Sequence, residues 1–309
     1  MKPVFLYAGQ GSQQVGMGQD FYEKYDTYRD FVDSIKLDFD HKKLMNEGPI
    51  ETLSLTEYTQ PCMSIFAAGI TMLLMEAGVK PEAAVGLSLG EYGALFAAGV
   101  FEAKDYVAMT AYRGREMAKA AEGLECTMSA ILGVSMEDVT TACKDYQGQG
   151  YVTVANYNCP GQYVICGDEE AVADTEARLK TMGAKRCVRL NVSGPFHTKF
   201  MAQAGDRLGE YLHNINFQTP NIPVALNVTG DFKAEDTNLK ESLIQQIQSS
   251  VHLEDDLRAI LGKGYRDFIE IGPGNVVSGF LKKTARDCGV EVNVTTINTV
   301  DDFIKIVGE

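Results

Sequence analysis

The stretch AAVGLSLGEYGAL, residues 83–95, places Ser88 between two glycines, where a short apolar run gives way to a helical pattern. The alanines and valine before Gly86 predict a buried strand, and the small residues after Ser88 predict a helix. This is the G-x-S-x-G pattern of a nucleophile elbow, a strained strand-to-helix turn that exposes a serine hydroxyl. Gly86 and Gly90 remove side chains that would collide at such a turn. The pattern therefore predicts a nucleophilic Ser88; the alternative is a tight turn with a packed serine.

A nucleophilic serine needs a base to take its proton, and the sequence offers four histidines. His197, in NVSGPFHTKF, leaves a predicted strand through a Gly-Pro turn and follows the serine in the chain, as in hydrolase-like enzymes. We favour His197, with His252 as the alternative. His41 lies in the charged stretch DHKKL, which predicts a solvated side chain, and His213 lies on an amphipathic helix, which predicts a surface or packing role. No acid between Ser88 and His197 stands out at a strand end, so a backbone or amide oxygen is an alternative partner for the imidazole.

The chain of 309 residues reads as strands alternating with helices, interrupted by a second pattern between residues 125 and 192. That second pattern is βαββαβ, the order of a ferredoxin-like unit. The flanking parts predict strands at 3–7, 83–85, 222–228, 267–271 and 290–296, and helices at 20–35, 59–77, 88–98, 105–121, 239–249 and 276–286. In the second of these helices, Pro61 suits the first turn. We therefore expect an α/β core of residues 1–124 and 193–309 with an inserted subdomain of residues 125–192.

Composition narrows the classes of partner. The net charge of −14 argues against nucleic acid or an anionic membrane surface as a general partner. The N-terminus has too short an apolar run for a signal peptide, and no apolar stretch approaches the ~20 residues of a membrane span. Seven cysteines without a C-x-x-C pair suit buried thiols in a reducing cytoplasm. The sequence shows no metal-ligand cluster such as H-E-x-x-H, so we expect no metal.

The loop GQGSQ, residues 9–13, follows the first predicted strand. Gln10, flanked by glycines, is placed to bring an amide close to a reacting carbonyl; the alternative is a plain glycine-rich turn. The loop matches neither the P-loop nor the G-x-G-x-x-G phosphate pattern.

Taken together, the motifs resemble those of the malonyl-CoA:acyl-carrier-protein transacylase family over nearly the whole chain. They occur in the family's order and spacing: GQGSQ at 9–13, TQP at 59–61, GLSLGEY at 86–92, RG at 113–114, NYNCPGQ at 156–162, GPFH at 194–197 and EIGPG at 270–274. The resemblance implies a hydrolase-like α/β core with a parallel sheet and a ferredoxin-like insert. It also implies transfer of a malonyl group from malonyl-CoA to the phosphopantetheine thiol of acyl carrier protein, supplying fatty acid synthesis.

The same resemblance assigns roles around the elbow. It implies that Ser88 is the nucleophile and His197 the base, and that the N–H of Leu89 together with Gln10 stabilises the oxyanion. The main-chain oxygen of Gln246 would orient the imidazole in place of an acid. The reaction implied is ping-pong through a Ser-linked acyl-enzyme, with no bound cofactor.

Two further residues carry substrate choice in this resemblance. Arg113 would pair with the malonyl carboxylate, since a guanidinium fork can hold a carboxylate bidentately. From the residue pattern alone, Arg113 reads as a solvated helix residue, because charges on helices usually are. Phe196, before the base, resembles the malonyl-selective pattern, in which a bulky ring leaves no room for a 2-methyl branch.

The implied partner is an acidic carrier protein, which must meet this acidic chain through a local basic patch. Lys185 and Arg186, at the start of the strand that leads towards His197, are the candidates; ordinary solvated charge is the alternative. We expect a monomer without nucleic-acid or membrane partners.

The sequence departs from the family pattern at three places. Leu87 stands where histidine is usual, Ala8 where proline is common, and Ser250-Val251-His252-Leu253 where Pro-Val-x-Trp is usual. Three other functions fit part of the pattern: a serine esterase or thioesterase, an acyltransferase of a polyketide pathway, and a binding module without catalysis.

Overall fold

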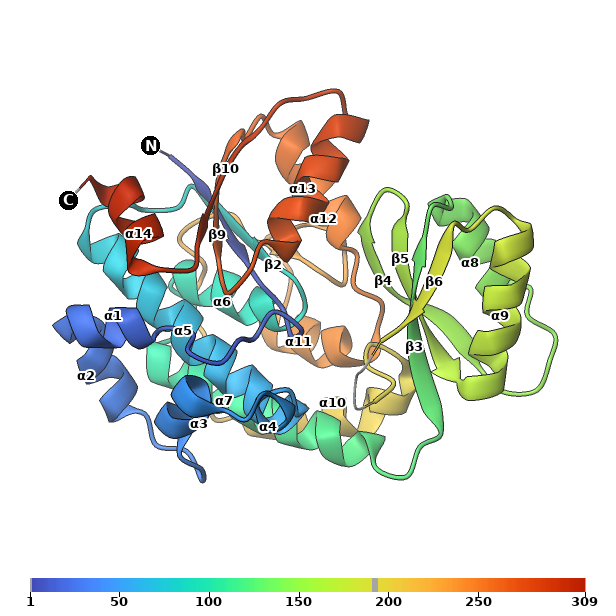
Figure 1. The fold of residues 1–309 in the computed structure, drawn as a ribbon, viewed down its shortest axis with the longest axis horizontal. Helices are drawn as coiled ribbons and strands as arrows, with labels where there is room; N and C mark the ends of the chain where they lie inside the picture. The colour runs from blue at the N-terminus through green and yellow to red at the C-terminus, as the bar shows by residue number, and fades with distance from the viewer. Residues whose placement is uncertain (1, 191–193, 309) are drawn as a thin grey trace.

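The larger part of the molecule is built around a parallel sheet (Figure 1). The computed structural model describes residues 2–190 and 194–308, and within them this sheet has four strands in the order β10-β9-β1-β2. Their bounds are Val4–Tyr7 for β1, Ala83–Gly86 for β2, Asp267–Ile271 for β9 and Asn293–Ile297 for β10. All neighbouring strands pair in parallel, as expected from strands joined through helices.

Side chains alternate across the sheet and so divide the core in two. Phe5 and Tyr7 of β1 belong to the cluster that contains the long helices α5 (Thr56–Glu76) and α7 (Ala103–Ala121). Val4 and Leu6 belong to the cluster with α12 (Leu253–Gly262) and α13 (Val276–Asp287). A strand apolar on both faces is the pattern of a parallel sheet covered by helices on each side.

The insert, at the other end of the molecule in Figure 1, is an antiparallel sheet in the order β4-β5-β3-β6. Its strands are β3 (Cys126–Leu132), β4 (Val152–Cys159), β5 (Gln162–Asp168) and β6 (Arg186–Arg189), with α8 (Met136–Lys144) and α9 (Glu169–Thr181) between them. This is the order of a ferredoxin-like unit, and it confirms the α/β fold with this insert. One face of the sheet packs on α8 and α9, and the other joins the core cluster of α5 and α7.

Shorter elements complete the chain. They are α1 (Gln19–Lys24), α2 (Asp26–Ser34), α3 (His41–Glu47), α4 (Ile50–Leu53), α6 (Leu89–Ala97), the 3-10 turn η1 (Lys199–Met201), α10 (Ala202–Leu212), β7 (Ala225–Leu226), β8 (Asp231–Phe232), α11 (Leu239–Gln248) and α14 (Val300–Val307). We propose the boundaries 1–124 and 193–309 for the core and 125–192 for the insert. The return from insert to core, including the predicted end of the last insert strand, falls at 191–193, outside the described residues.

The structure corrects three details of the sequence interpretation. The helix expected at 20–35 is two helices, because Tyr25 has an extended backbone and packs its ring on Phe303. Pro61 lies inside α5 rather than in its first turn, since the helix begins at Thr56. The strand expected at 222–228 shrinks to the two residues of β7, which pair antiparallel with β8; Pro223, which has no N–H to donate, precedes them.

By length and composition, α5 could cross a membrane, although no such segment was expected. In this structure 83% of its most apolar window is buried inside the protein, as in the core helix of a folded domain.

Candidate active site

Ser88 lies at the turn between β2 and α6, with φ 53° and ψ −100°. A non-glycine residue at positive φ is strained and persists only where its surroundings hold it. The two flanking glycines are required by close backbone approach: a Cβ on Gly86 would lie 1.9 Å from the carbonyl carbon of Gly90, and a Cβ on Gly90 would lie 2.2 Å from the carbonyl oxygen of Tyr7. The geometry is that of the elbow predicted from the sequence.

His197 is the histidine that the fold brings to Ser88. Its Nε2 lies 2.7 Å from the Ser88 Oγ, and its Nδ1 lies 2.8 Å from the main-chain oxygen of Gln246. Because a carbonyl oxygen only accepts, Nδ1 carries the proton and Nε2 presents its lone pair to the serine. Burial, and then the positive charge of Arg113, lower the pKa of His197 to about 4. The imidazole is therefore neutral at pH 7 and able to accept a proton.

Arg113 is buried, with 1% of its surface exposed, so the interpretation as a solvated helix residue is wrong. Within the described residues its guanidinium donates to the Gln60 side chain (2.8 Å), the Gln246 side chain (3.0 Å) and the Ser88 Oγ (3.1 Å). The ring of Tyr92 lies 5.4 Å from the guanidinium carbon, and burial lowers the pKa of Arg113. These partners are neutral oxygens, so among the described residues no carboxylate bonds directly to the positive charge beside Ser88.

A pocket of about 200 Å³ opens over these residues between core and insert. Gln10 and Phe196 line it from the core, beside Ser88 and His197, and the insert adds Met128, Asn156, Asn158, Val164 and Leu190. Gln10 donates its side-chain N–H to the Thr56 hydroxyl at 3.0 Å. Leu89 is the first residue of α6, so its N–H precedes the helical hydrogen-bond ladder and is placed to meet an oxyanion.

Lys185 and Arg186 are exposed and lie outside this pocket. Arg186 begins the edge strand β6, Lys185 directly precedes it, and the far end of the strand leads to Leu190 in the pocket wall. At ~3.3 Å per residue, Arg186 is about 13 Å along the strand from Leu190.

The remaining histidines lie elsewhere. His41 is buried, and its Nε2 lies 3.1 Å from the Val32 carbonyl oxygen; the prediction that it is solvated is wrong, because α3 packs on α2 there. His252 stacks on Tyr157 with ring centroids 4.9 Å apart and faces Asp255. His213 is exposed at the end of α10, as predicted.

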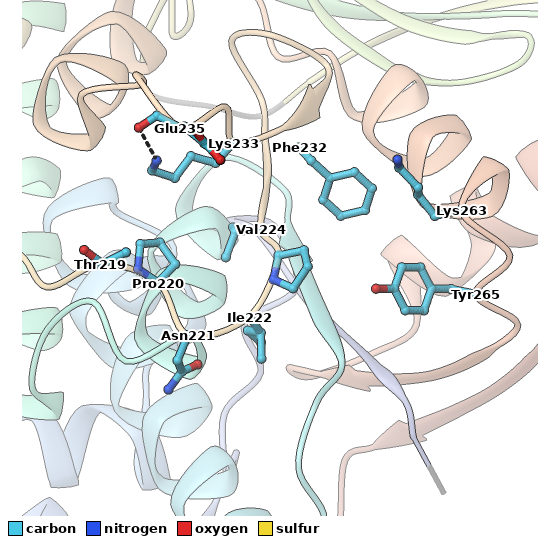
Figure 2. A pocket seen from close by; sticks show the side chains of 11 residues that line it. Thr219, Pro220, Asn221, Ile222, Val224, Phe232, Lys233, Glu235, Lys263 and Tyr265 are labelled. Carbon is cyan, nitrogen blue, oxygen red and sulfur yellow. Dashed lines mark hydrogen bonds between the residues drawn. The ribbon is translucent and has the colours of Figure 1, made fainter.

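A larger hollow of about 790 Å³ lies beside the β7–β8 hairpin (Figure 2). Figure 2 shows Phe232, Tyr265 and the prolines around it, with Lys233 folded back towards Glu235. It has no serine–histidine pair among its lining residues, so its size does not make it the reaction site.

Sequence reasoning missed three polar residues of the site. Gln60 lies in the TQP motif, and only its contact with Arg113 reveals its part. Asn158, in the NYNCPGQ motif, has a buried Oδ1 without a partner among the described residues. Asn227 accepts a hydrogen bond from the Ser88 main-chain N–H at 2.7 Å, and no motif marks it.

Comparisons of sequence and of structure with known proteins find acyltransferases. The acyl transferase domain family matches residues 4–305. A malonyl CoA-acyl carrier protein transacylase of Bacillus subtilis (strain 168) is 38% identical over 288 residues, which cover 92% of this chain and 91% of the relative. The crystal structure of a malonyl CoA-acyl carrier protein transacylase from Clostridium perfringens is 35% identical with a TM-score of 0.93, covering 100% of this chain and 96% of that one.

A third similar structure contains a partner. It is a type II PKS acyl-carrier protein in complex with its malonyl-transacylase, and the matching chain is 30% identical with a TM-score of 0.91. The match covers 100% of this chain and 99% of that chain.

Proposed function

We propose a reaction from the premise that this chain belongs to the acyl transferase family and is an acyltransferase: it moves a malonyl group from malonyl-CoA to the phosphopantetheine thiol of acyl carrier protein, supplying fatty acid synthesis. The relatives described above carry this activity in their names. The observation that carries the proposal is the contact of one serine oxygen with both a neutral imidazole and a buried guanidinium.

In the first half-reaction, the Ser88 Oγ attacks the thioester carbonyl carbon while its proton passes to Nε2 of His197. The N–H of Leu89 and the amide of Gln10 stabilise the oxyanion that forms. The intermediate collapses by breaking the carbon–sulfur bond, and the sulfur leaves with the proton from Nε2. The main-chain oxygen of Gln246 orients the imidazole throughout and supports the imidazolium.

The second half-reaction runs the same steps in reverse order. His197 takes the proton of the carrier-protein thiol, the sulfur attacks the Ser88 ester, and the serine leaves with the proton. One base thus serves both halves, which is the ping-pong scheme expected of a covalent intermediate.

Arg113 selects the acyl group in this proposal. A carboxylate entering a closed site loses its hydration, and a paired, hydrogen-bonded cation offsets that cost. Arg113 is such a cation, with an Nε that has no partner among the described residues and an Nη2 that now donates to Ser88. Phe196 lines the same pocket, and in this proposal its ring occupies the space that a 2-methyl branch would need. We expect Phe196→Ser to admit methylmalonyl-CoA, measured as a rise in its kcat/KM relative to malonyl-CoA.

The partner in this proposal is acyl carrier protein, and the complex of a similar transacylase with a type II PKS carrier supports it. The same similarity favours a second candidate, loading of a polyketide carrier by the same chemistry. Lys185 and Arg186 are the proposed docking cations, and the enzyme acts as a cytoplasmic monomer without a bound cofactor.

Intact-mass spectrometry tests the proposal. After mixing with malonyl-CoA, the protein should gain one malonyl group, and Ser88→Ala should abolish the gain. Ser129→Ala is the matched control, because this buried serine has a hydroxyl without a partner among the described residues. The label should then pass to phosphopantetheinylated carrier protein. A label that persists in Ser88→Ala overturns the nucleophile, and a label lost to water as fast as to carrier protein indicates a thioesterase instead.

A further inference from the structure

Asn227 is a fully buried residue whose side-chain amide bonds to the backbone of the elbow. Its side-chain Oδ1 accepts from the Ser88 N–H at 2.7 Å, and its Nδ2 donates to the Gly86 carbonyl oxygen at 2.8 Å. One side-chain amide therefore hydrogen-bonds to the backbone on both sides of Leu87. It comes from a segment 139 residues further along the chain than Ser88.

This amide takes the place of a missing strand neighbour. On one side of β2, the Leu87 N–H donates to the Tyr7 carbonyl oxygen of β1 at 3.0 Å. On the other side, backbone pairing stops early: the Ala84 N–H reaches the Pro223 carbonyl oxygen, and the chain then turns into the β7–β8 hairpin. Beyond that point the Asn227 side chain takes over, bonding to the Gly86 carbonyl oxygen and the Ser88 N–H.

Asn227 is itself fixed from behind. Its main-chain N–H donates to Glu91 Oε2 at 2.8 Å, and its main-chain oxygen accepts from the His252 N–H at 2.8 Å. Its Nδ2 also donates to Oδ2 of Asp256, on α12, at 2.8 Å. Because a carbonyl and a carboxylate oxygen face Nδ2, the amide can sit only with Oδ1 towards Ser88.

The acids on this side are fully buried, and burial raises the pKa of Glu91 to about 7 and that of Asp256 well above its usual range. Burying two carboxyl groups costs free energy unless they are hydrogen-bonded, so the fold must offset the desolvation of this cluster. What it holds in place is the turn that carries Ser88.

We propose that Asn227 is a positioning residue: by binding the Ser88 N–H and the Gly86 carbonyl, with Asp256 behind it, it holds the positive-φ turn that aims the serine oxygen at His197. It touches no reacting atom. The inference rests on the proposed acyl transfer through Ser88. A displacement of about 1 Å at a reacting group can cost about 100-fold in rate, so loss of this grip affects the acylation step itself.

The test is the first-turnover release of coenzyme A after rapid mixing with malonyl-CoA. The burst amplitude reports the fraction of folded, competent enzyme, and the burst rate constant reports how well each competent molecule is aligned. We expect Asn227→Ala to lower the limiting rate constant at least about tenfold, with an unchanged half-saturating malonyl-CoA concentration. Thr284→Val, a fully buried residue of α13 whose hydroxyl bonds only within its own helix among the described residues, is the control and should keep the wild-type rate.

A donor–acceptor swap keeps the inference testable if Asn227→Ala does not fold. Asn227→Asp still accepts from Ser88 but loses both donations and faces Asp256 with a second carboxylate, so its burst should be slow. Adding Asp256→Asn restores one donor–acceptor pair. The burst rate constant of the double variant should then be at least about fivefold higher than that of Asn227→Asp.

Three outcomes overturn the inference: an Asn227→Ala burst with wild-type rate and reduced amplitude, a change confined to the half-saturating concentration, or a swapped pair as slow as Asn227→Asp. A wild-type protein that releases no burst refutes the proposed function instead, so the two failures are distinguishable.

Discussion

The core and the insert meet at one pocket but contribute different things to it. The core supplies groups fixed by short hydrogen bonds, Ser88, His197 and Arg113, each held by partners from other elements. The insert supplies a wall, mostly apolar, from the sheet face that α8 and α9 leave open. It is joined to the core through backbone hydrogen bonds: the Tyr157 N–H donates to the Val251 carbonyl oxygen, and the Val251 N–H donates to the Ala155 carbonyl oxygen.

This difference follows from the two kinds of sheet. In a parallel sheet the strand ends and helix starts gather at one edge, where N–H groups and strained turns can act on a substrate. An antiparallel sheet has small net dipoles and offers a surface instead. We therefore expect changes in the core to alter the rate of chemistry, and changes in the insert to alter which molecules reach it.

The largest expected effect is at Arg113. Removing one partner of a buried charge pair costs roughly 2–5 kcal/mol, so Arg113→Ala should lower kcat/KM for malonyl-CoA by at least about tenfold. Acetyl-CoA should be accepted relatively better, because no unpaired guanidinium remains in the site. The measurement compares kcat/KM for the two thioesters, with Arg113→Lys as a control that keeps charge without the fork. An unchanged malonyl-over-acetyl ratio would show that another residue holds the carboxylate.

The next effect is on pH dependence. Since the pKa of His197 is about 4, this imidazole, the proposed base, stays unprotonated down to about that pH, and the acylation rate should be flat from pH 8 to about 5. Below pH 4 it should fall by about tenfold per unit. The unfolded imidazole titrates near 6.5, so the folded protein also loses stability as pH falls from about 6.5 towards 4. Single-turnover rates after a brief pH jump separate the two; a rate that halves near pH 6.5 contradicts the assignment.

A smaller effect is expected at the insert. Reversing both docking cations, Lys185→Glu with Arg186→Glu, should raise the apparent KM for carrier protein up to about tenfold and leave the malonyl-CoA half-reaction unchanged. The matched control is Lys233→Glu with Lys263→Glu, the same change of charge at the hollow in Figure 2. Equal effects on both half-reactions, or equal effects of both pairs, would count against docking on β6 and would break the division between core and insert.

The smallest effect is expected at Leu87, although it adjoins Ser88, the proposed nucleophile. Its side chain packs against Gly9 and cannot exchange protons, so it acts only through packing. Leu87→His should change turnover by less than the roughly tenfold that 1.4 kcal/mol represents, as should the control Leu87→Met. Steady-state rates at saturating malonyl-CoA check this. A change of several orders of magnitude would mean that the core's chemistry extends to this position.

The sequence was informative wherever a local pattern determines a local shape. The elbow at Ser88 needs two glycines at fixed offsets, and both are visible in five letters. Arg113 is different, because its burial is decided by α5 and α11, which are remote in sequence; helix charge patterns alone pointed to solvent. No sequence pattern marks Asn227, because its contact with Ser88 forms only when a segment remote in sequence packs beside the elbow. His41 was misjudged because charged neighbours in sequence say little about which helix packs on top.

The main-chain oxygen of Gln246 accepts a hydrogen bond from Nδ1 of His197, and this bears on which mutations can remove the contact. Every amino acid carries that oxygen, so no codon change at position 246 can delete it. A substitution there would remove the side-chain contacts with Arg113 and with the Ser88 carbonyl oxygen, yet leave the contact that orients His197. An acid in this role could be lost by one nucleotide change. The orientation of His197, the proposed base, therefore depends on the path of the backbone, and only a change that displaces the end of α11 would remove it.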